Sequence, residues 1–123
     1  MAHILLAEDD WLHREFLTRL LKIKGYEVTL ATHGQEAVDL AREIHPNIII
    51  MDIGMPVMDG LQAIGILRAD PQTNTIPIIV LSAFALHEDR DRAYAAGCDR
   101  FETKPVDFEN LQVQIQQLVA RTE

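Results

Sequence analysis

The 123-residue chain is long enough for one domain with a hydrophobic core, since 48% of its residues are hydrophobic and 24% are charged. Its formal net charge of −8 argues against binding to nucleic acid, which requires a basic surface to neutralise phosphates. The lone Cys98 excludes an intramolecular disulfide framework, and neither a signal peptide nor an apolar run near the roughly 20 residues of a membrane span is found, so we expect a cytoplasmic protein.

The first half of the chain alternates apolar runs typical of strands with amphipathic segments typical of helices. The first run leads directly into three carboxylates, Glu8, Asp9 and Asp10, and Asp10 is suited to cap the helix that follows. Gly25 marks the expected end of that helix. The predicted elements are strands at residues 3–7 and 26–31, the second nearer a sheet edge, and helices at residues 11–24 and 34–44.

The second half of the chain repeats this alternation around one central stretch. Residues 48–51 are apolar without interruption, which is typical of a strand buried on both faces of a parallel sheet, and they lead into Asp52. Asp59 and Gly60 then open a helix. The predicted elements are strands at residues 48–52, 77–82 and 99–103 and helices at about residues 59–68, 88–96 and 107–120.

Five strands alternating with five helices indicate a single α/β domain over residues 1–123. The expected architecture is a three-layer (βα)5 flavodoxin-like fold, in which helices cover both faces of a five-stranded parallel sheet. By analogy with such folds, we expect the strand order 2-1-3-4-5. The first and third strands are neighbours in that order, so Glu8, Asp9 and Asp52 would share one pocket at the carboxyl edge of the sheet.

Five polar side chains fall at the carboxyl ends of predicted strands, namely Glu8, Asp9, Asp52, Ser82 and Lys104. Three crowded carboxylates repel one another, so at least one pKa should be raised when no cation is bound. Mg²⁺ suits this set because it binds through one or two carboxylates and readily bridges to a phosphate. If Asp52 acted as a nucleophile, then Mg²⁺, Lys104 and the Ser82 hydroxyl could surround the transferred phosphoryl group. A merely solvated acidic rim is the alternative.

These stretches resemble the receiver domain of two-component response regulators, in particular the chemotaxis-regulator-like type without an output domain. The resemblance covers the whole chain and is carried by residues 4–10 (ILLAEDD), 51–60 (MDIGMPVMDG), 81–83 (LSA) and 103–105 (TKP). It implies a phosphorylation-dependent signalling switch that takes its phosphoryl group from a histidine kinase or a histidine phosphotransfer protein. It also implies that the protein is not an enzyme beyond assisting its own phosphorylation and dephosphorylation.

The resemblance implies a role for each matching residue. Asp52 resembles the phospho-acceptor, Ser82 the switch hydroxyl and Lys104 the cationic contact of the phosphoryl group. The Lys104-Pro105 bond is typically cis in this family, and Phe101 matches the aromatic residue that turns inward on activation. The implied Mg²⁺ ligands are Glu8, acting through water, Asp9, Asp52 and the backbone carbonyl of Gly54.

Three residues depart from the commonest family pattern. Phe101 stands where tyrosine is frequent, so no hydroxyl can form a hydrogen bond on burial. Gly54 contributes no side chain above the metal site. Phe84, two residues after Ser82, places an apolar group where polar residues are often found. We hypothesise that Phe84 restricts the entry of water and prolongs the phosphorylated state.

The resemblance also implies two partner surfaces. Phosphorylation would alter the face formed by the fourth helix, the fifth strand and the fifth helix, where an unknown downstream target would bind. The exposed top of the first helix would receive the kinase or phosphotransfer protein. The output face would include Arg90, Tyr94, Phe101 and Val106, and the top of the first helix Leu12 and His13, although all six could equally be ordinary surface or core-edge residues.

Three interpretations of the sequence are open. A stand-alone single-domain regulator, acting as an adaptor or a relay shuttle, is favoured because the chain starts with Met1 just before the first strand and ends after the fifth helix. The second is a receiver excised from a hybrid histidine kinase or a multidomain regulator. The third is a phosphatase with Asp52 as nucleophile, which is disfavoured because the usual position of its general acid is Gly54.

Overall fold

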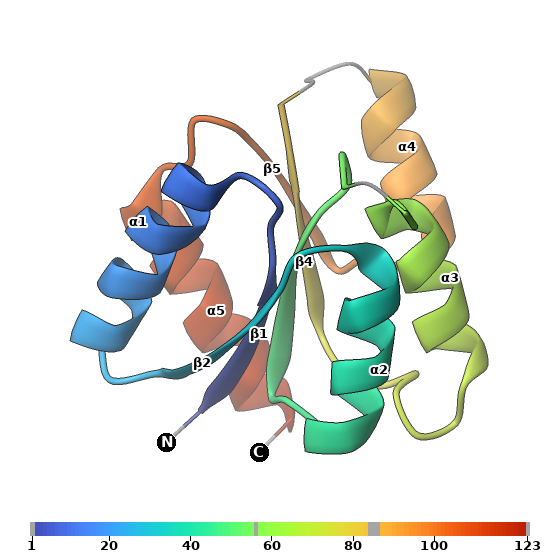
Figure 1. The fold of residues 1–123 in the computed structure, drawn as a ribbon, viewed down its shortest axis with the longest axis horizontal. Helices are drawn as coiled ribbons and strands as arrows, with labels where there is room; N and C mark the ends of the chain where they lie inside the picture. Colours follow the sequence, from blue (N-terminus) through green and yellow to red (C-terminus); the bar gives the residue numbers. More distant parts are fainter. Residues whose placement is uncertain (1, 56, 84–86, 123) are drawn as a thin grey trace.

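The computed structural model describes residues 2–55, 57–83 and 87–122, and within them strands and helices alternate from end to end (Figure 1). The strands form one parallel sheet in the order β2-β1-β3-β4-β5, which confirms the predicted topology. Element boundaries differ from the predicted ones by no more than two residues. The strands are β1 (His3–Ala7), β2 (Glu27–Ala31), β3 (Ile48–Asp52), β4 (Ile78–Ser82) and β5 (Arg100–Thr103), and the helices are α1 (Trp11–Ile23), α2 (Gly34–Ile44), α3 (Gly60–Ala69), α4 (His87–Ala96) and α5 (Phe108–Thr122).

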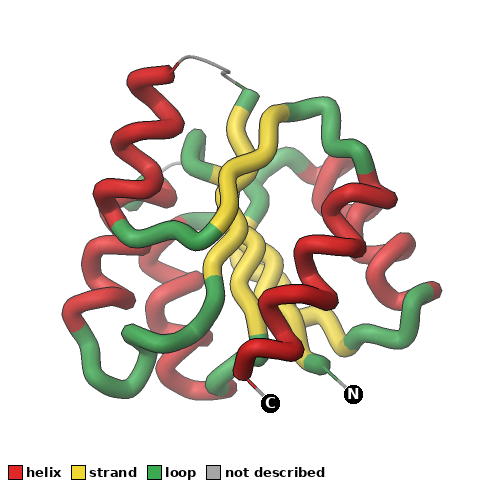
Figure 2. Tube along the Cα trace, turned by 180° about the vertical axis from the view of Figure 1, so that it is seen from behind, coloured by secondary structure: helices red, strands yellow, loops and turns green. Residues whose placement is uncertain are grey.

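The sheet is the middle of three layers. Helices α1 and α5 cover one face, and α2, α3 and α4 cover the other (Figures 1 and 2). Side chains of the central strands alternate between two hydrophobic clusters: Ile48 and Ile50 face α1 and α5, while Ile49 and Met51 face the other three helices. Because both faces of β3 are buried, it has the unbroken apolar sequence of a central parallel strand.

Helix α1 buries less of its apolar surface than its sequence predicts. Its apolar residues predict a single broad buried face, but only Leu17 and Leu21 among them are fully buried against the sheet and α5. Leu12, Phe16 and Ile23 are 70%, 54% and 77% exposed. The helix therefore buries a narrow stripe and presents a second apolar stripe at its surface, beside the exposed Trp11. No helix in the described ranges has both the length and the apolar character needed to cross a membrane.

The segment between β3 and α3 is held in place by the start of α2. The Gly34 N–H donates to the carbonyl oxygen of Met58 at 2.9 Å, and a Cβ at Gly34 would lie only 2.1 Å from that oxygen. Asp59 caps α3 in a reciprocal capping box with Gln62, as its place before Gly60 predicts. These contacts fix the chain that leaves Asp52.

Candidate functional site

The site lies at the carboxyl edge of the sheet, where β1 and β3 end side by side. Ala7 pairs with Met51, so Glu8 and Asp52 leave adjacent strands at the same level. One carboxylate oxygen from each of Glu8, Asp9 and Asp52 lies within 4.8 Å of the others. Glu8 is fully buried and Asp52 is 6% exposed, whereas Asp9 is open to solvent. The predicted cluster of three carboxylates is therefore present.

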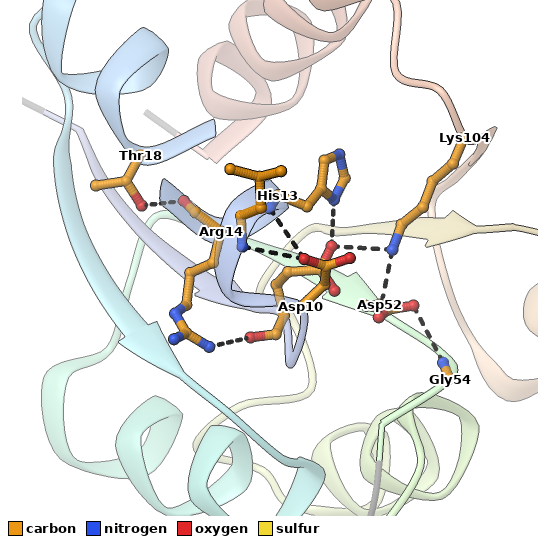
Figure 3. A network of polar contacts seen from close by, with 9 residues as sticks. Asp10, His13, Arg14, Thr18, Asp52, Gly54 and Lys104 are labelled. Carbon is orange, nitrogen blue, oxygen red and sulfur yellow. Dashed lines mark hydrogen bonds and ion pairs between the residues drawn. The ribbon is translucent and has the colours of Figure 1, made fainter. Parts of the chain in front are cut away.

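Glu8 is held from several sides. Its Oε1 accepts hydrogen bonds from His13 Nδ1 and, at 2.9 Å, from Lys104 Nζ, while Arg14 donates to its backbone carbonyl at 3.0 Å (Figure 3). Burial alone would raise the pKa of the Glu8 carboxyl, but its hydrogen bonds with Asp52, His13 and Lys104 hold the pKa below its usual value. The other oxygen, Oε2, is buried with no hydrogen-bond partner among the described residues.

Asp52 has fewer donors. Its Oδ1 accepts from the Gly54 N–H at 3.1 Å, and its Oδ2 lies 3.4 Å from Lys104 Nζ. Burial and the neighbouring Glu8 carboxylate raise the pKa of Asp52 above its usual value. Burial and Asp52 likewise raise the pKa of Asp9. The expectation that at least one carboxyl of this cluster has a raised pKa is met.

Lys104 brings one positive charge to the two buried acids. Burial lowers its pKa, but the hydrogen bond to Glu8 and the charges of Glu8 and Asp52 outweigh burial, so the net pKa is raised and the amine stays protonated. Its backbone N–H donates to the carbonyl oxygen of Ser82 at 2.8 Å, which fixes the end of β5 against β4. The peptide bond between Lys104 and Pro105 is cis, as expected.

A cleft of about 470 Å³ opens above these residues. Two side chains of α4, Asp89 and Arg92, contribute to it and form an ion pair of 2.7 Å. Neither was predicted from the sequence. Their spacing of three residues on a helix is the only signal in the sequence that could have paired them. The predicted site residues that line the cleft are Asp9, Asp52, Gly54, Ser82 and Lys104.

The oxygen atoms of the three carboxylates are arranged as a metal ion would require. Three carboxylates offer oxygen ligands within one cation's reach, and burial together with the neighbouring carboxylate raises the pKa of Asp9 and of Asp52. The partnerless Oε2 of Glu8 is a further buried oxygen that a cation would satisfy. The residues fit a hard divalent cation with oxygen ligands.

Two predicted features lie at the margin of the site. Phe101 is buried and already points inward, and the guanidinium carbon of Arg90 lies 5.5 Å from the centre of its ring. A role for Phe101 as a switch stays a prediction. Phe84 lies outside the described residues, so the hypothesis that it excludes water also stays a prediction.

Comparison with known proteins identifies the family. The model of the response regulator receiver domain matches residues 4–116. The chain belongs to this family. Receiver domains of two-component signalling are signalling proteins rather than enzymes. The polar-differentiation response regulator DivK of Brucella ovis is 37% identical over 103 residues, which are 84% of this chain and 84% of that protein.

Solved receiver domains share the whole fold. The receiver domain of the Francisella response regulator 1452 superposes with a TM-score of 0.93 at 30% identity and covers 100% of both chains. The receiver domain of a sensor histidine kinase from Pseudomonas aeruginosa superposes with a TM-score of 0.91 at 34% identity, covering 97% of this chain and 98% of that one. That structure is described with a magnesium ion coordinated in its active-site cleft.

Proposed function

We propose that this receiver is switched by a phosphoryl group transferred to Asp52 from a histidine kinase or a histidine phosphotransfer protein. The observation that carries the proposal is the placement of Asp52. It is a carboxylate at the floor of an open cleft, has a raised pKa, and lies 3.4 Å from a protonated lysine. Charge that develops on a phosphoryl group there would be neutralised without rearranging the protein.

Asp9, Glu8, Asp52 and the backbone carbonyl of Gly54 would hold Mg²⁺, which would supply positive charge to the phosphoryl oxygens. An Asp52 carboxylate oxygen forms a bond to phosphorus as the bond between phosphorus and the donor's imidazole nitrogen breaks. Lys104, whose Nζ lies 3.4 Å from Asp52 Oδ2, would add positive charge beside the incoming oxygens. Ser82 lines the same cleft, where its hydroxyl could contact the phosphorylated aspartate.

The donor protein would dock on the apolar surface of α1. A groove of about 570 Å³ runs from the start of α1 to the chain after β5 and reaches the site through Lys104. A helix carrying the phosphohistidine would bury exposed apolar area here and face Asp52. A downstream target would bind the face formed by α4, β5 and α5, on which Tyr94 is exposed. The groove is lined by Asp10, Leu12, His13, Phe16, Lys104, Pro105 and Val106.

The proposal is tested by phosphorylation with acetyl phosphate and MgCl₂, followed by mass spectrometry of the intact protein. We expect one phosphoryl adduct per chain and none in Asp52→Asn. Asp39→Asn is the matched control, because Asp39 is exposed on α2 and is hydrogen-bonded to Gln35 away from the cleft. An adduct that persists in Asp52→Asn would refute the assignment.

The same assay separates a switch from a phosphatase. Gly54 offers no general acid, so the leaving group of a phosphomonoester would not be protonated. We therefore expect a stoichiometric adduct without repeated turnover of monoesters. Removal of Mg²⁺ with EDTA should abolish the adduct, and MgCl₂ alone should change the fluorescence of Trp11, the residue that follows Asp9 and Asp10. Because acetyl phosphate is the phosphodonor, the test needs no kinase.

A further inference from the structure

His13 contacts the metal site from outside the carboxylate cluster. It is the third residue of α1, its side chain is 20% exposed, and its Nδ1 is hydrogen-bonded to Oε1 of the buried Glu8 (Figure 3). An ionised carboxylate oxygen can only accept, so the ring nitrogen donates in this contact. The contact joins residues five positions apart across the turn that ends β1.

Glu8 needs such support because of its length. A glutamate has one more rotatable bond than an aspartate, and ordering it costs side-chain entropy. Its Oε1 is fixed by His13 on one side and by Lys104 on the other, and its Oε2 remains buried without a partner among the described residues. A buried carboxylate oxygen in that state is costly unless a ligand satisfies it.

Lys104 alone does not fix the Glu8 carboxylate. Its Nζ is shared between Glu8 at 2.9 Å and Asp52 at 3.4 Å, so it serves the acceptor carboxylate as well. Within the described residues, the side chain of His13 is hydrogen-bonded to Glu8. The imidazole is also rigid and fixed at the capped start of α1, where Asp10 accepts its backbone N–H.

We propose that His13 is a positioning residue of the metal site: it fixes the Glu8 carboxylate so that Oε2 stays directed to the bound cation. This inference rests on the proposed function, because it requires that Mg²⁺ binds at Glu8, Asp9 and Asp52. Partners that orient metal ligands in this way typically change metal affinity by about 10- to 100-fold when they are removed.

The test is a titration of the full chain with MgCl₂, followed through the backbone amide resonance of Gly54 by NMR. His13→Leu removes the donor and should weaken Mg²⁺ binding by about tenfold. His13→Asn places an amide nitrogen near the position of Nδ1, so it should restore most of the affinity. In the Glu8→Gln background, His13→Leu should have little further effect, because the carboxylate that it positions is gone. Thermal unfolding of each variant verifies that it is folded, and His13→Ala replaces His13→Leu if the leucine variant is not.

The outcomes separate the two proposals. If the wild-type chain does not respond to MgCl₂, the metal site and this inference both fall. If the wild-type chain binds Mg²⁺ and His13→Leu binds it equally well, only this inference falls. Equal weakening of binding in the wild-type and Glu8→Gln backgrounds would show an effect of His13 on α1 rather than on Glu8, and would also overturn it.

Discussion

Glu8 and Asp52 follow neighbouring strands and are both buried, yet their pKa values move in opposite directions. Burial raises the pKa of each. At Glu8, hydrogen bonds with Asp52, His13 and Lys104 together more than offset burial. Asp52 receives one backbone N–H and a longer contact from Lys104, which do not.

Burial therefore does not by itself set the pKa of these acids; the hydrogen bond between the two acids and the donors around each of them decide its direction. Oε1 of Glu8 is held by His13 and Lys104, whereas its Oε2 has no partner among the described residues. Asp52 has fewer donors, so its negative charge is relieved by a proton, a bound cation or a covalent change. Glu8 is therefore the more firmly held of the two carboxylates, and Asp52 is the one that lines the cleft.

Removing Lys104 should have the largest effect on stability, because Glu8 and Asp52 share its charge. In Lys104→Met both buried acids lose their shared cation, so we expect the free energy of unfolding to fall by about 2 kcal/mol, less than for a fully buried pair because Lys104 is partly exposed. Urea denaturation measures the change. Arg42→Met removes the same charge from the Arg42–Asp70 pair at 2.8 Å, at the surface, and should cost clearly less than Lys104→Met. Equal losses in the two variants would show that Lys104 does not compensate the acids.

Neutralising the two acids one at a time should change stability in opposite directions. Asp52→Asn removes surplus charge and should raise the free energy of unfolding by on the order of 1 kcal/mol. Glu8→Gln loses charge-assisted hydrogen bonds from His13 and Lys104 and should lower it by about 1.5 kcal/mol. Both are measured in urea at neutral pH with EDTA present. A change of the same sign in both variants would contradict the asymmetry.

The pH dependence should show the same asymmetry at smaller amplitude. The pKa of Asp52 is raised in the folded state above its ordinary value of 3.8. The wild-type chain therefore loses stability as pH rises from 3.8 through the pKa of the folded state. The advantage of Asp52→Asn should therefore grow over this interval.

Because the folded-state pKa of Glu8 lies below 4.5, its contribution is present above that pH and is lost as pH falls through the folded value. The deficit of Glu8→Gln should therefore shrink on acidification. Urea denaturation of the three proteins between about pH 3 and pH 7 measures both trends. Parallel stability curves for all three proteins would contradict both.

The sequence predicted those parts of the site that follow from the ends of strands. Parallel strands place their carboxyl ends on one edge of the sheet, so the sequence predicts that Asp9, Asp52 and Lys104 lie close together there. The contact of His13 with Glu8 was missed, because it depends on how a side chain turns back from a helix. Asp89 and Arg92 were missed because the tilt of α4 over the cleft is a matter of tertiary packing.

Helix α1 shows the same limit for the fold. Its spacing identified a helix correctly, but periodicity does not reveal which of two adjacent apolar stripes another element will cover. The sheet and α5 bury the stripe with Leu17 and Leu21 and leave Leu12 and Phe16 at the surface. The central strands were easier to predict, because an uninterrupted run such as residues 48–51, followed by turn-forming residues, is typical of a strand buried on both faces. The strand order was expected only by analogy with similar folds.

The contact between Gly34 and Met58 has a consequence for inherited variation. Any side chain at position 34 would displace the carbonyl of Met58, and with it the segment that carries the Gly54 N–H to Asp52. A variant at position 34 would then disturb the site although every acid, the lysine and the serine of the site were intact. In a genetic screen such a lesion would map to a helix start that has no chemistry of its own.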